Sequence, residues 1–336
     1  MKAFLLEDFG LQNLKLAEVS TPEPGRDELL VKVSAVSLNF RDRAIAEGYY
    51  APEKMPKNLI PTSDASGTVV KTGTGVTRFV TGDRVTSHFT SRWLDGTAER
   101  NASDFSLGGP LNGGLAEYMI LNQDGAVATP TTLTDQEAST LPIAALTAWF
   151  SLIERGGLQP GNTVLVQGTG GVSIAAVQIA TALGARVIAT SGDEDKSRRV
   201  KELGVTDVIN YRTTPDWEKA ALELTGGLGV DQVLDVVGGE SLNRSIRATR
   251  PGGHVSVIGF LDGLSAHLDL MPLLFGQTRL TGIATGHRRA FERMNTFIEQ
   301  RGIKPVIDTV YPFEDSLAAF ERVGQGAFGK IVISVS

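Results

Sequence analysis

The stretch QGTGGVS, residues 167–173, combines residue types that suit a phosphate-binding turn. Gly168 permits a tight turn, and Gly170 lets the backbone approach a pyrophosphate closely. Ser173 stands at the third small position, which serves close packing of a helix on the sheet, so we expect serine to be tolerated there. An apolar run precedes the turn and a helix-forming run follows it, so helix N–H groups would face an anion. The pattern predicts a dinucleotide site, with an empty structural turn as the less favoured alternative. The expected contacts are Gly168, Thr169, Gly170, Gly171 and Val172.

The residues after the second strand of this unit indicate which dinucleotide binds. An NAD site usually has an acidic residue there, which bonds the ribose 2′-hydroxyl. Here the strand ends at the neutral Ser191, and Lys196, Arg198 and Arg199 follow it. The acidic residues 193–195 in the same loop oppose a 2′-phosphate. We therefore expect NADP(H), with NAD(H) as the alternative.

Other catalytic chemistries lack their residues. The chain has no cysteine, which removes thiolate nucleophiles, disulfides and every cysteine-containing zinc site. The four histidines, at 88, 254, 267 and 287, show no ligand spacing. No nucleophile elbow of a serine hydrolase occurs. Thiolate, cysteine–zinc and nucleophile-elbow chemistry are therefore not expected.

The bulk properties indicate a soluble, cytoplasmic protein with a small-molecule substrate. The 336 residues carry 32 basic and 38 acidic side chains and no basic stripe, so nucleic acid is not an expected partner. The opening MKAFLLEDFG is broken by Glu7 and Asp8 and is not expected to be a signal peptide. The longest apolar stretch, residues 141–153, is too short to span a bilayer.

Three regions that differ in their pattern of apolar residues must position these residues. Residues 1–125 read as short strands and turns, because apolar residues alternate from Leu29 to Ala35. Residues 126–284 alternate apolar strands with helices, which predicts a parallel sheet. Residues 285–336 return to mixed structure and end in a strand. The expected strands of the middle region are 163–167, 185–191, 207–211, 231–237 and 254–259, and its helices are 172–183, 196–203, 216–225 and 242–250.

The motifs, in their order and spacing, resemble the medium-chain dehydrogenase/reductase superfamily over essentially the whole chain. The likeness is greatest to its zinc-free, quinone-oxidoreductase-like members, often labelled alcohol dehydrogenases. The resemblance implies an α/β fold in which residues 1–125 and 285–336 form a GroES-like β-rich catalytic domain and residues 126–284 a doubly wound Rossmann domain. The motifs that carry it are SLNFRD (37–42), IPTSDASGTV (60–69), GDRV (82–85), GGLAEY (113–118), LPIAALTAWFSL (141–152), VLVQGTGGVS (164–173), INYR (209–212), PGGHVSVIG (251–259) and FGKIVI (328–333).

The resemblance also locates the positions at which relatives bind zinc. A ligand cysteine of those relatives corresponds to Asn39 and a ligand histidine to Ser63, and the loop that holds their structural zinc corresponds to residues 87–114. No zinc is therefore expected, and Asp42 and Asp64 are expected to be structural. The 87–114 loop has no clear periodicity, and we expect it to shape the mouth of the cleft.

Without a zinc ion, fewer hydride-transfer reactions are accessible to the site. Zinc lowers the pKa of bound water from about 15.7 to about 7. This shift favours ionisation by a free energy on the order of 12 kcal/mol. Neutral hydrogen bonds net only about 1 kcal/mol each. Hydride transfer to an acceptor that is already electrophilic, such as a quinone, an enone or an activated ketone, is the expected reaction. An alcohol dehydrogenase acting on a specialised alcohol and a non-catalytic dinucleotide-binding protein are the alternatives.

The resemblance implies a role for each remaining residue. Asn39 would lie near the nicotinamide and the substrate carbonyl, Tyr50 would donate to a developing oxygen with Tyr49 as its competitor, and Thr147 would lie against the nicotinamide ring. Residues 279–286 would pair with a second copy in a homodimer. The further cofactor contacts expected are Ser191, Gly192, Lys196 and Tyr211 at the adenosine phosphate, Ile258, Gly259 and Phe260 at the carboxamide, Lys330 at the pyrophosphate, and Arg288 as a weaker candidate.

Overall fold

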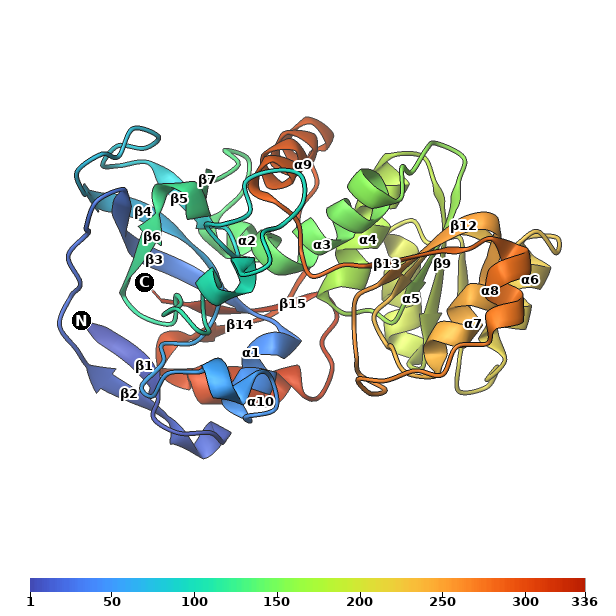
Figure 1. Ribbon diagram of the computed structural model, residues 1–336, viewed down its shortest axis with the longest axis horizontal. Helices are drawn as coiled ribbons and strands as arrows, with labels where there is room; N and C mark the ends of the chain where they lie inside the picture. The colour runs from blue at the N-terminus through green and yellow to red at the C-terminus, as the bar shows by residue number, and fades with distance from the viewer. Residues whose placement is uncertain (336) are drawn as a thin grey trace. The chain divides into compact units, whose positions relative to one another are not determined.

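The computed structural model describes residues 1–335, and the chain forms two compact units (Figure 1). The first comprises residues 1–146 and the chain from Gly286 onward, and the second comprises residues 147–285. The pattern of apolar residues in the sequence changes at residue 126, whereas the boundary between the two units follows residue 146. The difference arises because β7 (Ala126–Ala128) pairs with β5 (Arg84–Ser87) in the sheet of the first unit.

The first unit is built on a seven-stranded sheet in the order β14-β15-β3-β4-β5-β7, with β6 paired to β3. The central strand β3 is buried on nearly its whole length, because β4, β6 and β15 all pair with it. Both the N-terminal part of the chain and the C-terminal segment supply strands, so the sheet is complete only when the C-terminal strands have joined it. The strands are β3 (Glu28–Leu38), β4 (Asp64–Thr72), β6 (Tyr118–Asn122), β14 (Ile307–Pro312) and β15 (Lys330–Ser334), and β1 (Lys2–Leu6) and β2 (Leu14–Glu18) form a separate antiparallel pair.

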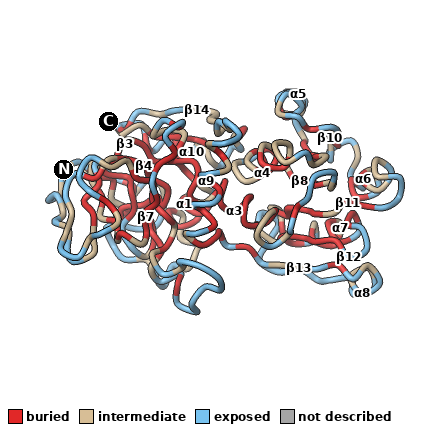
Figure 2. The backbone as a smooth tube through the Cα atoms, turned by 90° about the horizontal axis from the view of Figure 1, so that it is seen from above, coloured by how far each residue is buried: buried red, intermediate tan, exposed pale blue. Residues whose placement is uncertain are grey.

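Four helices accompany this sheet, and α10 and α1 contact one another. The packed core includes Phe4, Leu29 and Phe320, all almost completely buried, and the sheet strands run through buried stretches of the tube in Figure 2. No helix among residues 1–335 has the length and apolar character needed to cross a bilayer. The four helices are α1 (Phe40–Ala46), α2 (Asp135–Ser139), α9 (Arg288–Arg301) and α10 (Ser316–Val323).

The second unit is a six-stranded parallel sheet in the order β10-β9-β8-β11-β12-β13. The chain order reverses between β8 and β11, and ligands of such sheets bind beyond the carboxyl ends of the strands at this point. The predicted strand–helix alternation is confirmed. The strands are β8 (Thr163–Gln167), β9 (Arg186–Ser191), β10 (Asp207–Asn210), β11 (Val230–Asp235), β12 (Thr249–Val257) and β13 (Arg279–Gly282), and the helices are α3 (Leu146–Trp149), α4 (Gly171–Ala182), α5 (Glu194–Glu202), α6 (Trp217–Leu224) and α7 (Ser241–Ala248).

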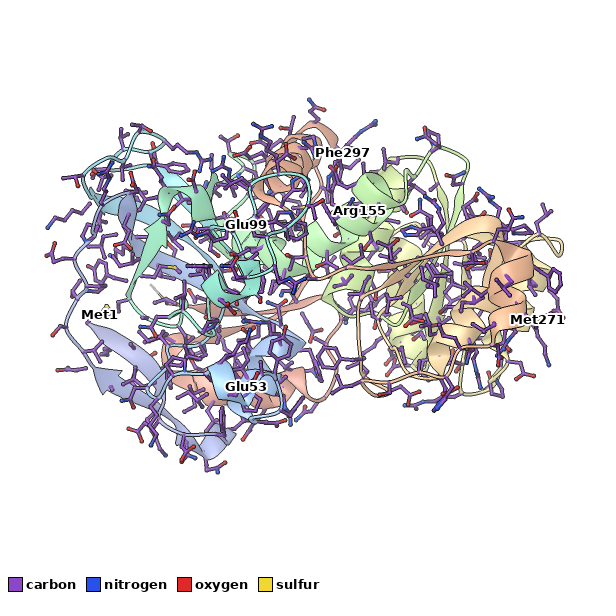
Figure 3. All side chains as sticks on the ribbon, viewed as in Figure 1. Met1, Glu53, Glu99, Arg155, Met271 and Phe297 are labelled. Atoms are coloured by element: carbon purple, nitrogen blue, oxygen red, sulfur yellow. The ribbon has the colours of Figure 1, made fainter. Side chains whose placement is uncertain are left out.

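Two details differ from the sequence expectation. The helix expected over 242–250 ends at Ala248, and residues 251–253 lie within β12 rather than in a separate turn, because the register with β11 shifts there. Helix α8 (Leu270–Gly276) was not expected, since its apolar side chains leave no polar face to give a helical period. Met271 projects outward from it (Figure 3).

Candidate active site

The glycine turn joins β8 to α4 in the second unit, and its backbone has the geometry of an anion cradle. Gly168 has a φ of +70°, a region that side chains other than glycine rarely adopt. A Cβ added to Gly170 would meet no atom within 4 Å, so open space lies against the backbone at this point. The first helical N–H groups of α4 have no partner within the helix. The turn therefore fits a cofactor pyrophosphate, which these N–H groups would bind.

Ser173 resolves the departure from three glycines. Its side chain is buried, and its hydroxyl donates to the carbonyl oxygen of Gln167 at 2.7 Å. The serine thus fastens the first turn of α4 to the end of β8. Serine is thus accommodated at this position, where glycine would allow close packing of the helix on the sheet, and it adds a hydrogen bond.

A buried polar network fixes the turn that follows β11. The carboxylate of Asp235 accepts hydrogen bonds from the backbone N–H of Gly238 at 2.7 Å and from the Ser245 hydroxyl at 2.6 Å. The side chain of Gln167 joins the network by accepting from the N–H of Val236 at 3.1 Å and donating to Ser245. Sequence reasoning missed this network, although polar residues that end buried apolar strands are a recognisable signal.

The expected adenosine-phosphate residues come together within the second unit. Ser191 ends β9 and Gly192 follows it, and Tyr211 and Arg212 follow the adjacent strand β10. A Cβ on Gly192 would lie 2.6 Å from Cζ of Tyr211 and 2.9 Å from Nε of Arg212, so a larger residue here would require both side chains to shift. Arg212 was not expected from the sequence, and its signal is its place beside Tyr211 in the same loop.

The three acids that oppose a 2′-phosphate each have a partner of their own. Asp193 accepts from the N–H of Lys196 at 2.9 Å, and this bond lowers the pKa of Asp193. Glu194 accepts from the Asn210 amide at 2.9 Å, and Asp195 pairs with Arg198. Asp193 therefore caps α5 rather than reaching toward a ligand, which weakens the electrostatic objection to NADP(H).

Residues 258–260 follow the carboxyl end of β12, on the same edge of the sheet as the glycine turn. The N–H of Ile258 donates to the carbonyl of Asp235 at 2.8 Å. Gly259 is required here, because a Cβ would lie 1.8 Å from the carbonyl oxygen of Val236. Thr147, at the start of the second unit, is buried, and its hydroxyl has no hydrogen-bond partner in the described chain.

In the first unit, Asn39 and Lys330 form the centre of a buried polar cluster. Asn39 follows β3, and Lys330 begins β15, whose antiparallel register with β3 pairs Ile331 with Leu38. The Lys330 ammonium donates to Oδ1 of Asn39 at 2.7 Å and to the carbonyl oxygen of Leu38 at 2.8 Å, and only 5% of the residue is exposed. Nδ2 of Asn39 is buried and has no partner among residues 1–335.

Two buried carboxylates complete this cluster. Asp64 lies 3.6 Å from the Lys330 ammonium and accepts from the Ser63 hydroxyl at 2.8 Å. Asp42 accepts from the backbone N–H of Asn39 at 2.7 Å, while its other oxygen has no partner in the described residues. Burial, and next the nearby charge of Asp64, raise the pKa of Asp42 to about 6. Burial lowers the pKa of Lys330, opposed by the charges of Asp64 and Asp42.

These residues do not fit a zinc ion at the position that relatives use. The oxygen of Asn39 faces an ammonium, and the oxygen of Ser63 is turned toward Asp64. A cation placed beside a buried ammonium meets like-charge repulsion in a medium of low dielectric. Among residues 1–335, no three His, Cys, Asp or Glu side chains are grouped so that they could hold a metal ion.

Tyr50 and Tyr49 occupy different environments. Tyr50 packs against the core of the first unit, and the guanidinium of Arg41 lies 5.4 Å from the centre of its ring. Arg41 is buried and donates to the Leu107 carbonyl at 3.1 Å, which ties Tyr50 to the 87–114 loop. Tyr49 is 48% exposed, and burial of its hydroxyl and the charge of Glu47 raise its pKa. Tyr50 is the better placed of the two for a role in a buried site.

Two expected cofactor residues have partners inside the first unit. Arg288 pairs with Asp124 at 2.6 Å and with Glu292 at 3.5 Å. The Lys330 ammonium donates to Leu38 and Asn39 and forms an ion pair with Asp64 at 3.6 Å. Their roles at the pyrophosphate stay predictions, and the observed contacts place Lys330 with the catalytic candidates.

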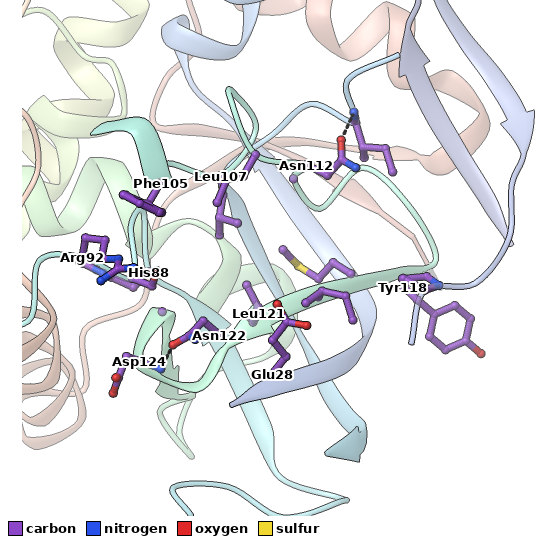
Figure 4. Close-up of a pocket in the computed structure, with 18 of the residues that line it drawn as sticks. Glu28, His88, Arg92, Phe105, Leu107, Asn112, Tyr118, Leu121, Asn122 and Asp124 are labelled. Carbon is purple, nitrogen blue, oxygen red and sulfur yellow. Dashed lines mark hydrogen bonds between the residues drawn. The ribbon is translucent and has the colours of Figure 1, made fainter. Parts of the chain in front are cut away.

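The 87–114 loop lines a cavity of about 950 Å³ in the first unit, shown in Figure 4. His88, at the start of the loop, is fully buried, and its two ring nitrogens lie 2.6 Å from the Thr90 carbonyl and 2.9 Å from the Gly286 carbonyl. Burial lowers the pKa of His88 to about 4. Neither Asn39 nor Tyr50 lines this cavity, so it is separate from the polar cluster.

Known proteins are similar to this chain in sequence and in fold. The family model for the alcohol dehydrogenase GroES-like domain matches residues 25–131, and that for zinc-binding dehydrogenases matches residues 171–300. A zinc-type alcohol dehydrogenase-like protein of Schizosaccharomyces pombe is 38% identical over 97% of this chain and 96% of its own length. The quinone oxidoreductase of Mus musculus is 28% identical over 99% of this chain and 97% of its own length. A crystal structure provisionally named an alcohol dehydrogenase, from Sinorhizobium meliloti 1021, superposes with a TM-score of 0.93 at 41% identity, covering 99% of this chain and 98% of that one.

The chain belongs to the medium-chain alcohol dehydrogenase and quinone oxidoreductase superfamily, with a GroES-like β unit and a Rossmann unit. It is an NAD(P)-dependent oxidoreductase of the alcohol dehydrogenase or quinone oxidoreductase type.

Proposed function

We propose that this protein is a zinc-independent, NADP(H)-dependent reductase of activated alkenes, quinones or carbonyls. The observation that carries the proposal is the Lys330 ammonium 2.7 Å from Oδ1 of Asn39, at a position where relatives place a metal ligand. An alcohol must lose a proton as it gives up hydride, and neutral hydrogen-bond donors contribute little to that ionisation. An electrophilic acceptor needs only a donor for the oxygen on which charge develops.

Three side chains are proposed to act on the reactants. NADPH, when bound, would supply a hydride to an electrophilic carbon of the acceptor, and the acceptor's oxygen would take up the displaced π electron pair. Asn39 is proposed to donate a hydrogen bond to that oxygen, and Tyr50 to deliver a proton to it. Thr147 is proposed to hold the nicotinamide ring through its buried, unpartnered hydroxyl.

The preference for the phosphorylated cofactor is proposed from charge. Lys196, Arg212 and the hydroxyl of Tyr211 are the groups offered to a 2′-phosphate, and Gly192 leaves them room. The three nearby acids are engaged with an N–H, an amide and an arginine. An isolated acid that could bond a 2′-hydroxyl is lacking at the end of β9, where Ser191 stands.

Steady-state assays in metal-depleted buffer test the proposed reaction. NADPH oxidation is measured with a panel of quinones, enones and activated ketones, and NADP⁺ reduction with a panel of alcohols. The proposal expects turnover with the first panel, and it fails if only the second panel is turned over.

Oxidation of a specialised alcohol is the second candidate, favoured by the name of the S. pombe relative. It requires a group that ionises the alcohol, and Asp42, whose pKa is raised to about 6, is a buried carboxyl group that accepts from the Asn39 N–H. Steady turnover of alcohols by metal-depleted protein would favour this reading.

We also propose that the protein acts as a homodimer. Strand β13 is the edge of the six-stranded sheet, and α8, which precedes it, exposes a row of apolar side chains. Phe275 is 77% exposed, an unusual state for a large aromatic side chain on a solvated surface. A second copy of the same strand can pair with this edge and cover the patch. The patch consists of Leu261, Leu264, Leu268, Leu270, Met271, Leu274 and Phe275.

A further inference from the structure

The buried side-chain amide of Asn39 has an oxygen that can accept and a nitrogen that can donate, but only the oxygen has a partner in the described chain. Oδ1 accepts from Lys330, while Nδ2 is buried and has no partner in the described chain. A buried donor left without an acceptor costs about 1–3 kcal/mol. A ligand oxygen is the partner that would remove this cost.

Lys330 decides which way the amide points. An ammonium has three donors and no acceptor, so the atom that faces it must be the amide oxygen. The alternative flip of Asn39 would place an NH2 group 2.7 Å from the ammonium, donor against donor. The orientation of Nδ2 therefore follows from the chemistry of lysine.

The rest of the cluster holds Lys330 in place. Its ammonium also donates to the Leu38 carbonyl at 2.8 Å and lies 3.6 Å from Asp64. Its backbone is set by the β15–β3 pairing, next to the residue pair Ile331 and Leu38. The Asn39 backbone is fixed separately, because its N–H donates to Asp42. Neither partner is free to turn when a ligand arrives.

We infer that Lys330 is a positioning residue for hydride transfer, which holds and polarises the Asn39 amide so that Nδ2 donates to the acceptor oxygen on which negative charge develops. This inference rests on the proposed reductase function. A charged donor on Oδ1 strengthens the bond that the same amide makes through Nδ2. Lys330 thus acts through Asn39 rather than on the cofactor's pyrophosphate.

Asn39→Asp is the sharpest variant, because it keeps the shape and the Lys330 contact but replaces the Nδ2 donor with an oxygen. We expect kcat at saturating NADPH to fall on the order of 100-fold, as for loss of one oxyanion donor. The dissociation constant of NADPH, measured by fluorescence titration, should not change. A variant that turns over the acceptor at the wild-type rate overturns the inference.

A double-mutant cycle then separates the two roles of Lys330. Lys330→Met alone should lower kcat roughly tenfold, the loss of one charge-assisted hydrogen bond, and should have little further effect in an Asn39→Ala background. An equal rise in the NADPH dissociation constant in both backgrounds would instead identify a pyrophosphate ligand and overturn the inference. If Lys330→Met does not fold, the Asn39→Asp result decides alone.

The wild-type assay separates this inference from the function on which it rests. If the wild type reduces none of the acceptors, the proposed function and the inference fall together before any variant is made. If the wild type is active and both variants retain full kcat, only the inference fails.

Discussion

At the scale of single residues, Asn39 lies in a network of buried hydrogen bonds, at the position that the resemblance to zinc-using relatives assigns to a metal ligand. The ammonium of Lys330 supplies a positive charge, and Asp64 and Asp42 surround it with two carboxylates. In the inferred mechanism, this charge acts on a reactant through the Asn39 amide, which accepts from the ammonium. Such a site offers directed donors of modest strength, which suits acceptors that already attract hydride.

Tyr50 and Tyr49 give a matched pair of variants for the proton donor. Tyr50→Phe removes a hydroxyl whose ring packs against the core and Arg41, and we expect kcat to fall on the order of 100-fold. Tyr49→Phe removes a more exposed hydroxyl and should leave kcat within about twofold. Stopped-flow measurement of NADPH oxidation at saturating acceptor compares them, and equal rates would remove Tyr50 from the mechanism.

Asp42 should give the protein a pH-dependent stability. Its pKa rises from 3.8 to about 6 on folding, so the folded state binds the proton more tightly and stability falls as pH rises through this range. Asp42→Asn keeps an oxygen for the Asn39 N–H and removes the ionisation. The free energy of unfolding of the variant relative to wild type should increase by about 2 kcal/mol between about pH 4.5 and about pH 7.

Urea titrations of both proteins at the two pH values provide the measurement. A difference that stays constant with pH, or that shrinks as pH rises, would show that Asp42 is already ionised when folded at low pH.

The sequence could locate the residue types of this cluster but not their contacts. Asn39 and Lys330 are separated by most of the chain, and they meet because β15 pairs with β3. Neither a strand pairing across the whole sequence nor its register can be read from local periodicity. The expectation for Lys330 therefore followed its neighbours in the sequence, whereas its contacts follow the sheet.

At the scale of elements, the carboxyl edge of the parallel sheet positions the residues proposed to bind the cofactor. This edge was predictable, because the strand–turn–helix order around Gly168 is local and parallel strands end on the same side. Helix α8 and the irregular start of β12 were not, since an all-apolar helix and a bulge leave no periodic signal.

Lys196 and Arg212 should decide cofactor preference together. Replacing both with alanine removes two positive charges, and we expect NADPH affinity to fall on the order of 100-fold, at about 1.4 kcal/mol per charge. NADH affinity should change by less than about threefold, because NADH lacks the phosphate. Arg198→Ala is the control, since Arg198 is exposed and pairs with Asp195. Paired fluorescence titrations would contradict the assignment if wild type prefers NADH or if both affinities fall equally.

At the scale of the whole molecule, the exposed apolar surface of α8 is the basis of the proposed homodimer. Phe275→Glu together with Leu274→Glu places charge on the patch, and we expect a shift from dimer to a monomer of 35.8 kDa in light scattering after size exclusion. Leu228→Glu is the matched control, because Leu228 is 72% exposed on the same unit but outside the patch. A wild-type protein that is already monomeric, or a doubly substituted variant that remains dimeric, would contradict the proposed interface.

The organisation of the chain into two units was expected from its motifs, and membership of the superfamily confirms the fold. Two of the similar proteins are named zinc-type, whereas in this chain the amide oxygen of Asn39 accepts from a lysine and the hydroxyl of Ser63 donates to an aspartate. The proposed reductase would stabilise developing charge with these donors rather than with a metal ion.

Metal content measured alongside turnover tests this claim most directly. Protein dialysed against a chelator and then analysed by inductively coupled plasma mass spectrometry should contain far less than about one zinc per chain and should reduce a quinone or enone with NADPH at an unchanged rate. Retention of about one zinc per chain, with turnover lost on its removal and restored by its return, would contradict the account.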